Sequence, residues 1–333
     1  MVPGTPALKK AIKAKFEREN GLSYDVNQIT VGTGGKQVLY NAFMATINKG
    51  DEVIIPAPYW VSYIEIVKMA GGIPVVIHAG IDQDFKINAT QFEAAITPKT
   101  KLFIFSSPCN PTGSVYTKEE LRGLADVLVK HTDLIALSDE IYEHIRFEGE
   151  HASLAQFSEI FDQVVTVNGV SKAWAMTGWR LGYIGASKQI ADACNKIQGQ
   201  FTSGTSSITQ RAAIAAMDAD PSVLKEMVET FHKRRDLVLS YLNKIPGVKC
   251  NVPTGAFYLF PDVSAYFGTK DGDQLIQDGD DLCMYLLREG NIALVDGKGF
   301  GAPNCIRISY AASEEQLMKA MERLTAALAK LSR

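Results

Sequence analysis

The sequence predicts an α/β protein with a mostly parallel, seven-stranded sheet, helices on both of its faces, and a smaller α+β unit after it. Short β-branched runs alternate with amphipathic helical patterns through most of the chain, which is typical of strands buried on both faces. Near residue 240 the pattern changes to very short strands, and 333 residues are enough for about two domains. We therefore expect a large domain at 1–238 and a small domain at 239–333.

The large domain is expected to begin with a helix and then to alternate strands with helices. The first helix is expected at Pro6–Asn20. The strands are expected at Gln28–Gly32, Val53–Ala57, Ile73–His78, Leu102–Ser106, Leu134–Ser138, Val164–Asn168 and Leu181–Ala186. The helices between them are expected at Gln37–Asn48, Tyr59–Ala70, Lys118–His131 and Gln189–Gln200. Sheets of this kind bind ligands where their strands end at the carboxyl edge.

A long helix is expected to lead into the small domain. At Ser222–Leu242, apolar residues recur at helical spacing on one side and charged residues lie on the other. Pro246-Gly247 marks its end. The small domain is then expected to contain strands near Ala256–Phe260, Ile292–Val295 and Cys305–Ser309, and a closing helix at Glu314–Leu331.

Composition and charge narrow the function classes. Lys and Arg number 34 against 37 Asp and Glu, which gives a net charge of −3 and no basic excess for binding nucleic acid. No apolar run approaches the roughly 20 residues that a membrane span needs, and the first residues do not resemble a signal peptide. The five cysteines are widely spaced without a Cys-x-x-Cys pair. We expect a cytoplasmic enzyme with reduced thiols and no metal.

A glycine-rich loop lies between the first expected strand and helix. Gly32-Thr33-Gly34-Gly35-Lys36 allows close approach of the backbone to an anion, and free N–H groups at a helix start bind phosphate. Gln37 stands where a dinucleotide-binding fingerprint needs its third glycine, and the Walker pattern also fails. A plain tight turn is an equal alternative for this loop.

Two further segments follow strands and therefore lie at the same expected edge. Asn110, in the rigid turn Ser107–Gly113, is a candidate for contacting a ligand, with a purely local role in the turn as the alternative. Asp139 ends the next strand, and Tyr142 can reach the same side. A metal site of Asp139, Glu143 and His144 competes with this interpretation. Glu140, Glu143 and His144 are themselves expected to form a solvated helix start.

Lys172 and Arg180 complete the candidate chemistry. Lys172 follows a buried strand among small and apolar residues, and partial burial favours the neutral, nucleophilic form of an amine. Arg180 opens the next expected strand, where a guanidinium can bind a phosphate through two hydrogen bonds. A lysine is more often found at the surface with its ammonium in water, but this position is a poor one for a surface residue.

These segments, in this order, resemble the class I aminotransferases of fold type I, which use pyridoxal 5'-phosphate. The most specific match is Gly169-x-Ser171-Lys172 followed by Gly178-x-Arg180-Leu181-Gly182, and Asn110–Gly113 and Asp139-Glu140-x-Tyr142 are further hallmarks. The resemblance extends from Gly4 to about Leu331. It is strongest to bacterial aspartate aminotransferases of the Ib subgroup, through the segments Gly34–Gln37, Pro58–Tyr63 and Ile306–Tyr310.

The resemblance implies a role for each matching residue. Lys172 would attach to the cofactor aldehyde and then move a proton to and from the substrate. Asp139 would keep the pyridine nitrogen protonated, and Tyr142 and Asn110 would hydrogen-bond the phenolic oxygen. The other implied cofactor contacts are Trp60 on the ring and Gly34, Gly35, Lys36, Ser171 and Arg180 at the phosphate. The implied substrate contacts are Lys36, Trp60 and Asn110, with Arg307 at the α-carboxylate.

The implied reaction is L-aspartate plus 2-oxoglutarate to oxaloacetate plus L-glutamate. In the Ib subgroup a lysine at the position of Lys36 binds the distal carboxylate of the substrate. Two alternatives remain: Lys36 could face solvent, and Ser171 could serve only to hydrogen-bond backbone groups. A prephenate or aromatic aminotransferase, a β-lyase of the same fold, and an inactive cofactor-binding protein are the alternatives. The missing third glycine disfavours a dinucleotide-dependent dehydrogenase.

The sequence departs from the family in one respect. Relatives carry a further N-terminal segment ahead of the position of Gly4, which supplies part of the small domain and contacts the other subunit of a homodimer. We therefore expect a homodimer that is weaker than those of the relatives, and transamination that is weakened while the cofactor still binds.

Overall fold

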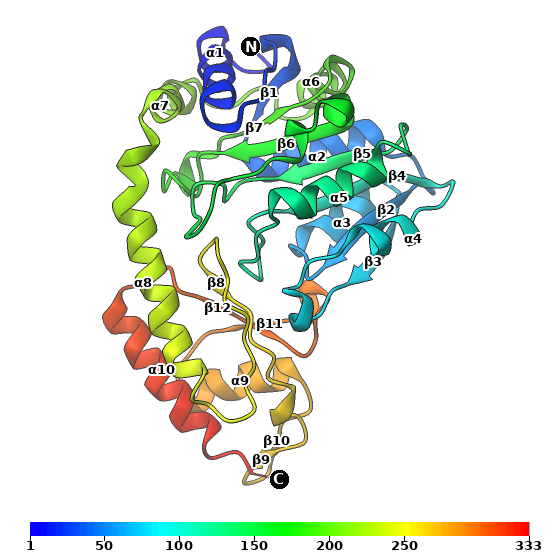
Figure 1. Ribbon diagram of the computed structural model, residues 1–333. Helices are drawn as coiled ribbons and strands as arrows, with labels where there is room; N and C mark the ends of the chain where they lie inside the picture. The colour runs from blue at the N-terminus through cyan, green and yellow to red at the C-terminus, as the bar shows by residue number, and fades with distance from the viewer. Residues whose placement is uncertain (333) are drawn as a thin grey trace.

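The computed structural model describes residues 1–332 and contains a seven-stranded sheet with helices on both faces (Figure 1). The strand order is β1-β7-β6-β5-β4-β2-β3. Strand β7 pairs antiparallel with β1 and β6, whereas the strands from β6 to β3 pair in parallel, so the expected mostly parallel sheet is confirmed. The strands are β1 Ile29–Gly32, β2 Glu52–Ala57, β3 Ile73–His78, β4 Thr100–Ser106, β5 Ile135–Asp139, β6 Val164–Gly169 and β7 Gly182–Gly185.

Helices cover the two faces because apolar side chains alternate along the central strands. In β2, Val53 and Ile55 pack into the core under α2, α3 and α6, while Ile54 packs into the opposite core under α1, α4, α5 and α7. These helices are α1 Pro6–Lys15, α2 Gly35–Thr46, α3 Ser62–Met69, α4 Ala89–Ala94, α5 Lys118–Leu128, α6 Lys188–Phe201 and α7 Ser207–Asp218. The sheet is therefore a buried middle layer, and its polar groups are accessible only at its edges.

A second core lies at the other end of helix α8, Lys225–Leu242, which runs along both parts of the chain (Figure 1). A three-stranded sheet in the order β11-β12-β8 packs there against α9 and α10. These elements are β8 Tyr258–Leu259, β11 Val295–Asp296, β12 Ile306–Ser309, α9 Gly279–Glu289 and α10 Glu314–Leu328, with a small hairpin of β9 Lys270–Asp271 and β10 Gln274–Leu275. Helix α8 passes through residue 239, so the domain division there stays a prediction.

Several elements differ from their expected bounds. The first helix ends at Lys15 and continues as a π-helix, Phe16–Asn20, which stops at Gly21 in the left-handed conformation. The helix expected from Tyr59 begins at Ser62. Helices α4, α7 and α9 were not expected: α4 is one short turn and a half, and α7 is rich in alanine and so carries little amphipathic contrast.

The topology brings distant loops to one edge of the sheet. Strands β1, β4, β5 and β6 all run in the same direction, so their carboxyl ends lie together, and antiparallel β7 starts at that same edge. Consequently the segments after Gly32, Ser106, Asp139 and Gly169 and the segment before Gly182 meet there. Within residues 1–332, none of the helices is long and apolar enough to cross a membrane.

Candidate active site

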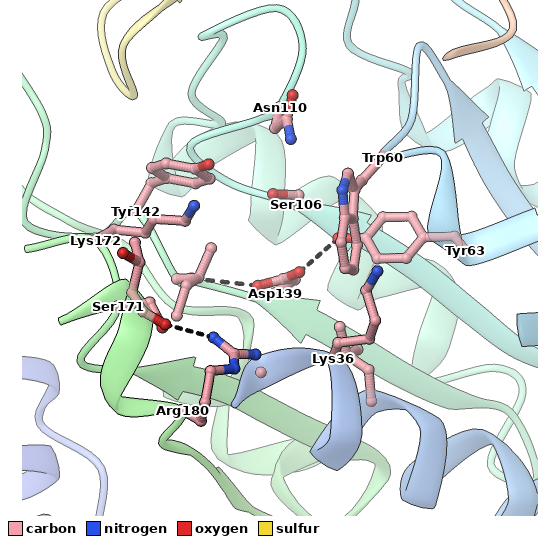
Figure 2. A pocket seen from close by; sticks show the side chains of 14 residues that line it. Lys36, Trp60, Tyr63, Ser106, Asn110, Asp139, Tyr142, Ser171, Lys172 and Arg180 are labelled. Atoms are coloured by element: carbon pink, nitrogen blue, oxygen red, sulfur yellow. Dashed lines mark hydrogen bonds between the residues drawn. The ribbon is translucent and has the colours of Figure 1, made fainter. Parts of the chain in front are cut away.

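A cavity of about 210 Å³ opens at this carboxyl edge, and most of the predicted site residues line it (Figure 2). The predicted residues in its walls are Gly35, Lys36, Trp60, Asn110, Asp139, Tyr142, Ser171, Lys172 and Arg180. Gly34 lies against the guanidinium of Arg180, and Arg307 donates a hydrogen bond to Asn110, so both adjoin the same space. The remaining wall residues, which the sequence did not single out, are Leu39, Tyr63, Ser106, Ile141 and Thr177.

Asp139, the last residue of β5, is buried and faces this cavity from below Trp60 and Tyr63 (Figure 2). The Tyr63 hydroxyl donates to its Oδ2 at 2.6 Å, and the Ile141 N–H donates to its Oδ1 at 3.3 Å. Burial raises the pKa of Asp139 to about 6, although these two hydrogen bonds and Lys172 oppose the rise. The carboxylate is thus held in one orientation and is readily ionised by an apposed cation.

Tyr63 is a functional candidate that the sequence interpretation missed. It lies on α3, one turn after Trp60, and its ring meets the Trp60 ring edge-on at 5.5 Å between centroids. The segment Pro58–Tyr63 was recognised, but only Trp60 was given a role in it. In the helix expected from Tyr59, the spacing of three residues would have placed both aromatic rings on the same side.

Lys172 lies in the turn after β6, and its ammonium projects into the cavity (Figure 2). Its Nζ lies 5.4 Å from the centre of the Tyr142 ring and 5.8 Å from that of Phe257. Burial lowers the pKa of Lys172, with Arg307 and Arg180 adding to the effect and Asp139 opposing it. Burial and the nearby cations therefore favour the neutral amine that a nucleophile or base requires.

Arg180, Gly34 and Gly35 form a site for an anion. Arg180 precedes β7 in a left-handed conformation, with φ of 53°, and donates to the Thr177 carbonyl at 2.7 Å. A Cβ added at Gly34 would collide with the Arg180 guanidinium, and one at Gly182 would collide with the Gly35 backbone. No ion pair among residues 1–332 engages Arg180, so its charge and the N–H groups at the start of α2 are available to a phosphate.

Arg307, on β12, adjoins the cavity through its contact with Asn110. Its Nη1 donates to Asn110 Oδ1 at 2.9 Å, and the guanidinium lies 4.7 Å from the ring centre of Tyr258 and 5.0 Å from that of Phe300. Within the described part of the chain, its buried Nε has no hydrogen-bond partner. A buried donor without an acceptor costs free energy, so the Nε side of the guanidinium is suited to binding a carboxylate.

Lys36 lies at the open side of the cavity, in the first turn of α2. The side chain is exposed, but its Nζ lies 4.9 Å from the centre of the Trp60 ring. The alternative of a Lys36 that faces only solvent is therefore incomplete, because the ammonium also borders the cavity.

The expectation of a solvated helix start at Glu140, Glu143 and His144 is wrong. Glu140 and Glu143 are buried, and the segment forms turns rather than a helix. Glu143 pairs with the buried ammonium of Lys15 on α1, which no local pattern could reveal. Asp139 and Tyr142 face the cavity, while Glu143 faces Lys15, so the structure separates the residues that a metal site at Asp139 would need.

The raised pKa of Asp139 predicts a pH-dependent gain of stability for the cofactor-free Asp139→Asn variant. Above its ordinary pKa of 3.8 the unfolded carboxyl ionises, while the folded one resists ionisation until about pH 6. The unaltered protein therefore loses stability across this window, by about 3 kcal/mol in all. The variant has no such cost, so its unfolding free energy relative to the unaltered protein should rise from pH 4 to pH 7. Urea unfolding between pH 4 and pH 7 measures this difference in unfolding free energy, with the exposed Asp133→Asn variant as control. A difference that does not change with pH would contradict the prediction.

Comparison with known proteins finds similar chains over nearly the whole sequence. The profile of the family described as aminotransferase class I and II matches residues 2–324. The chain is 49% identical over 334 residues to the aspartate/prephenate aminotransferase of Cereibacter sphaeroides, covering 99% of this chain and 84% of that protein. The crystal structure of the aspartate aminotransferase from Rhizobium meliloti superposes with a TM-score of 0.97 at 46% identity, over 99% of this chain and 84% of that one. The aspartate aminotransferase from Thermus thermophilus with maleate gives 0.91 at 40% identity, over 98% and 82%.

Proposed function

Because this chain belongs to the class I and II aminotransferases, we propose that it transfers the amino group of L-aspartate to 2-oxoglutarate, giving oxaloacetate and L-glutamate, with pyridoxal 5'-phosphate as cofactor. The observation that carries the proposal is the convergence of Lys172, Asp139 and Arg180 on one cavity, from the end of β5 and from the segment between β6 and β7. A desolvated amine, a buried acid and an unpaired guanidinium are the groups that this chemistry needs. The names of the similar proteins agree with it.

The cavity fits a phosphorylated aromatic cofactor. No side chain fits at Gly34 or Gly182, because a Cβ there would collide with Arg180 or with the backbone at the start of α2. Arg180, the N–H groups at the start of α2 and Ser171 would together hold the phosphate. Trp60 would cover the ring, and the ionised Asp139 carboxylate, oriented by Tyr63, would pair with the pyridine nitrogen. Tyr142 and Asn110 would contact the phenolic oxygen.

In the proposed transamination, Lys172 would transfer the proton, while Asp139 and Arg307 would bind and orient the cofactor and the substrate. Pyridoxal phosphate supplies a reactive aldehyde and an electron-accepting ring that draws charge from the substrate Cα. The Lys172 amine would take the Cα proton and deliver it to the cofactor carbon that carried the aldehyde, a task that its lowered pKa favours. Asp139 would hold a proton on the ring nitrogen, and Arg307 would bind the α-carboxylate and so orient the Cα–H bond.

The acidic substrate is inferred from Lys36, which would meet the distal carboxylate at the open side of the cavity. A second candidate activity is amino transfer to prephenate, because the similar Cereibacter sphaeroides protein carries both activities in its name. A panel of amino donors and acceptors separates the two, and also separates both from a β-lyase, which releases pyruvate without an acceptor.

Absorbance and chemical trapping test the cofactor and the lysine together. The purified protein incubated with pyridoxal phosphate should develop a visible absorbance band. Reduction with borohydride followed by peptide mapping should then find the label on Lys172. A protein that stays colourless, or a label on another lysine, would overturn the assignment.

Arg307→Lys is expected to weaken use of all amino acid substrates by about 10- to 100-fold in kcat/KM, because an ammonium cannot replace the two-pronged guanidinium contact. The loss should lie mainly in KM for the amino donor. Arg288→Lys, an exposed change on α9, is the control. Unchanged steady-state kinetics for Arg307→Lys would place the carboxylate elsewhere.

The working assembly is proposed to be a cytoplasmic homodimer. Phe201 at the end of α6 is 70% exposed and stacks on Tyr40, and Ile208 at the start of α7 is 76% exposed. Large exposed apolar side chains favour contact with another protein surface. Sedimentation over a range of concentrations tests this: a protein that stays monomeric at micromolar concentration contradicts it.

A further inference from the structure

Two tyrosines from different parts of the chain meet behind the cavity. Tyr142 follows β5 of the large sheet, and Tyr258 lies in β8 of the small sheet. Their hydroxyl oxygens are 2.9 Å apart, and both side chains are buried. Tyr142 lines the cavity and Tyr258 does not, so the Tyr258 hydroxyl contacts a wall residue from behind.

Tyr258 also supports the arginine that faces the substrate. Ser309 and Tyr258 are partners across β12 and β8, so Arg307 lies two residues from this pairing on the neighbouring strand. The Arg307 guanidinium lies 4.7 Å from the ring centre of Tyr258 and also hydrogen-bonds Asn110. One tyrosine thus connects Tyr142 with Arg307.

The direction of the hydrogen bond decides what Tyr258 does. A hydroxyl has one proton to donate and two lone pairs to accept with, and either tyrosine can be the donor here. If Tyr142 donates its proton toward the cavity, its oxygen must accept from Tyr258. Burial raises the pKa of the Tyr258 phenol, while the hydrogen bond with Tyr142 and the facing Arg307 lower it. The positive charge of Arg307 thus makes Tyr258 a better donor than it would otherwise be.

We propose that Tyr258 is a positioning residue that donates its hydroxyl proton to Tyr142 and thereby directs the Tyr142 proton into the cavity, toward the phenolic oxygen of the cofactor. The inference rests on the proposed function. A hydroxyl that accepts one hydrogen bond donates a stronger one, so Tyr258 increases the stabilisation that Tyr142 gives to the ionised phenolic oxygen.

The visible absorbance of the cofactor-loaded protein, followed against pH, tests this without measuring turnover. Tyr258→Phe should raise the pH midpoint of the absorbance change by roughly half a unit to one unit, because the hydrogen bond that favours the ionised oxygen becomes weaker. Tyr285→Phe removes another buried hydroxyl, which bonds Asp271 and the Ala327 carbonyl far from the cavity. Tyr285→Phe should leave the midpoint unchanged, although it should lower the melting temperature about as much as Tyr258→Phe does.

A second background shows whether Tyr258 acts through Tyr142. In Tyr142→Phe protein, which has its own raised midpoint, adding Tyr258→Phe should cause no further rise. An equal rise in both backgrounds, or no rise with Tyr258→Phe alone, overturns the inference while leaving the proposed function standing. An unaltered protein without any cofactor absorbance would instead refute the proposed function.

Discussion

Lys172→Ala is expected to reduce aspartate transamination by about 10⁴-fold or more. The substitution removes both the amine that would attach to the cofactor and the base that would move the substrate proton, and proton transfer alone contributes about 10² to 10⁴ in rate. The structure offers no second amine in that place: among the residues that line the cavity, the other lysine is Lys36, at its open side. Steady-state formation of oxaloacetate measures the effect.

Two controls separate this loss from misfolding. Lys196→Ala, an exposed change on α6, should leave the rate unchanged. Cofactor-free Lys172→Ala should melt at or above the temperature of the unaltered protein, because burial disfavours the charged amine that it removes. Retention of more than a tenth of the activity would show that a different group carries the proton.

Lys15→Met is expected to lower the free energy of unfolding by about 3–5 kcal/mol, although Lys15 lies outside the cavity. The ammonium of Lys15 is buried and contacts Glu143, and also donates to Asn20 Oδ1 at 2.8 Å. Burial alone would raise the pKa of Glu143, but Lys15 and the nearby His144 and His151 hold it well below its usual range. Without Lys15 the carboxylate would lose its main buried counter-charge, which is the costly case for a buried ion pair.

Urea unfolding of matched variants measures this cost. Lys10→Met, at an exposed position of the same helix, should change the free energy by less than about 0.5 kcal/mol. The double variant Lys15→Met/Glu143→Gln should recover much of the stability, since it removes the uncompensated charge. Equal losses in the single and double variants would mean that packing of the Lys15 methylenes, not charge, is responsible.

Much of the fold was predictable because it depends on local patterns. Apolar runs bounded by helical segments located all seven strands of the large sheet to within a few residues. Residues that directly follow such runs lie at the carboxyl edge whatever the details of packing, which is why Asn110, Asp139 and Lys172 were found together. The family resemblance is likewise confirmed, because ordered motifs survive in the sequence itself.

Other features depend on contacts between distant segments. Tyr63 was missed because its hydroxyl bonds Asp139, 76 positions away, and Tyr258 because it meets Tyr142 from the second core. Helix α7 was missed because its alanine-rich stretch shows little contrast between its two faces, and it is held by packing on α1.

The amino-acid sequence by itself determined the alternation of strands and helices, the edge where polar groups gather, and the identity of the lysine and acid placed there. Periodicity and strand ends are properties of neighbouring residues, so they can be read along the chain. Only the tertiary structure decided the environment of each charge. Glu143 resembles a solvated carboxylate in sequence, yet it is buried against Lys15, because burial and pairing depend on which segments the fold brings together.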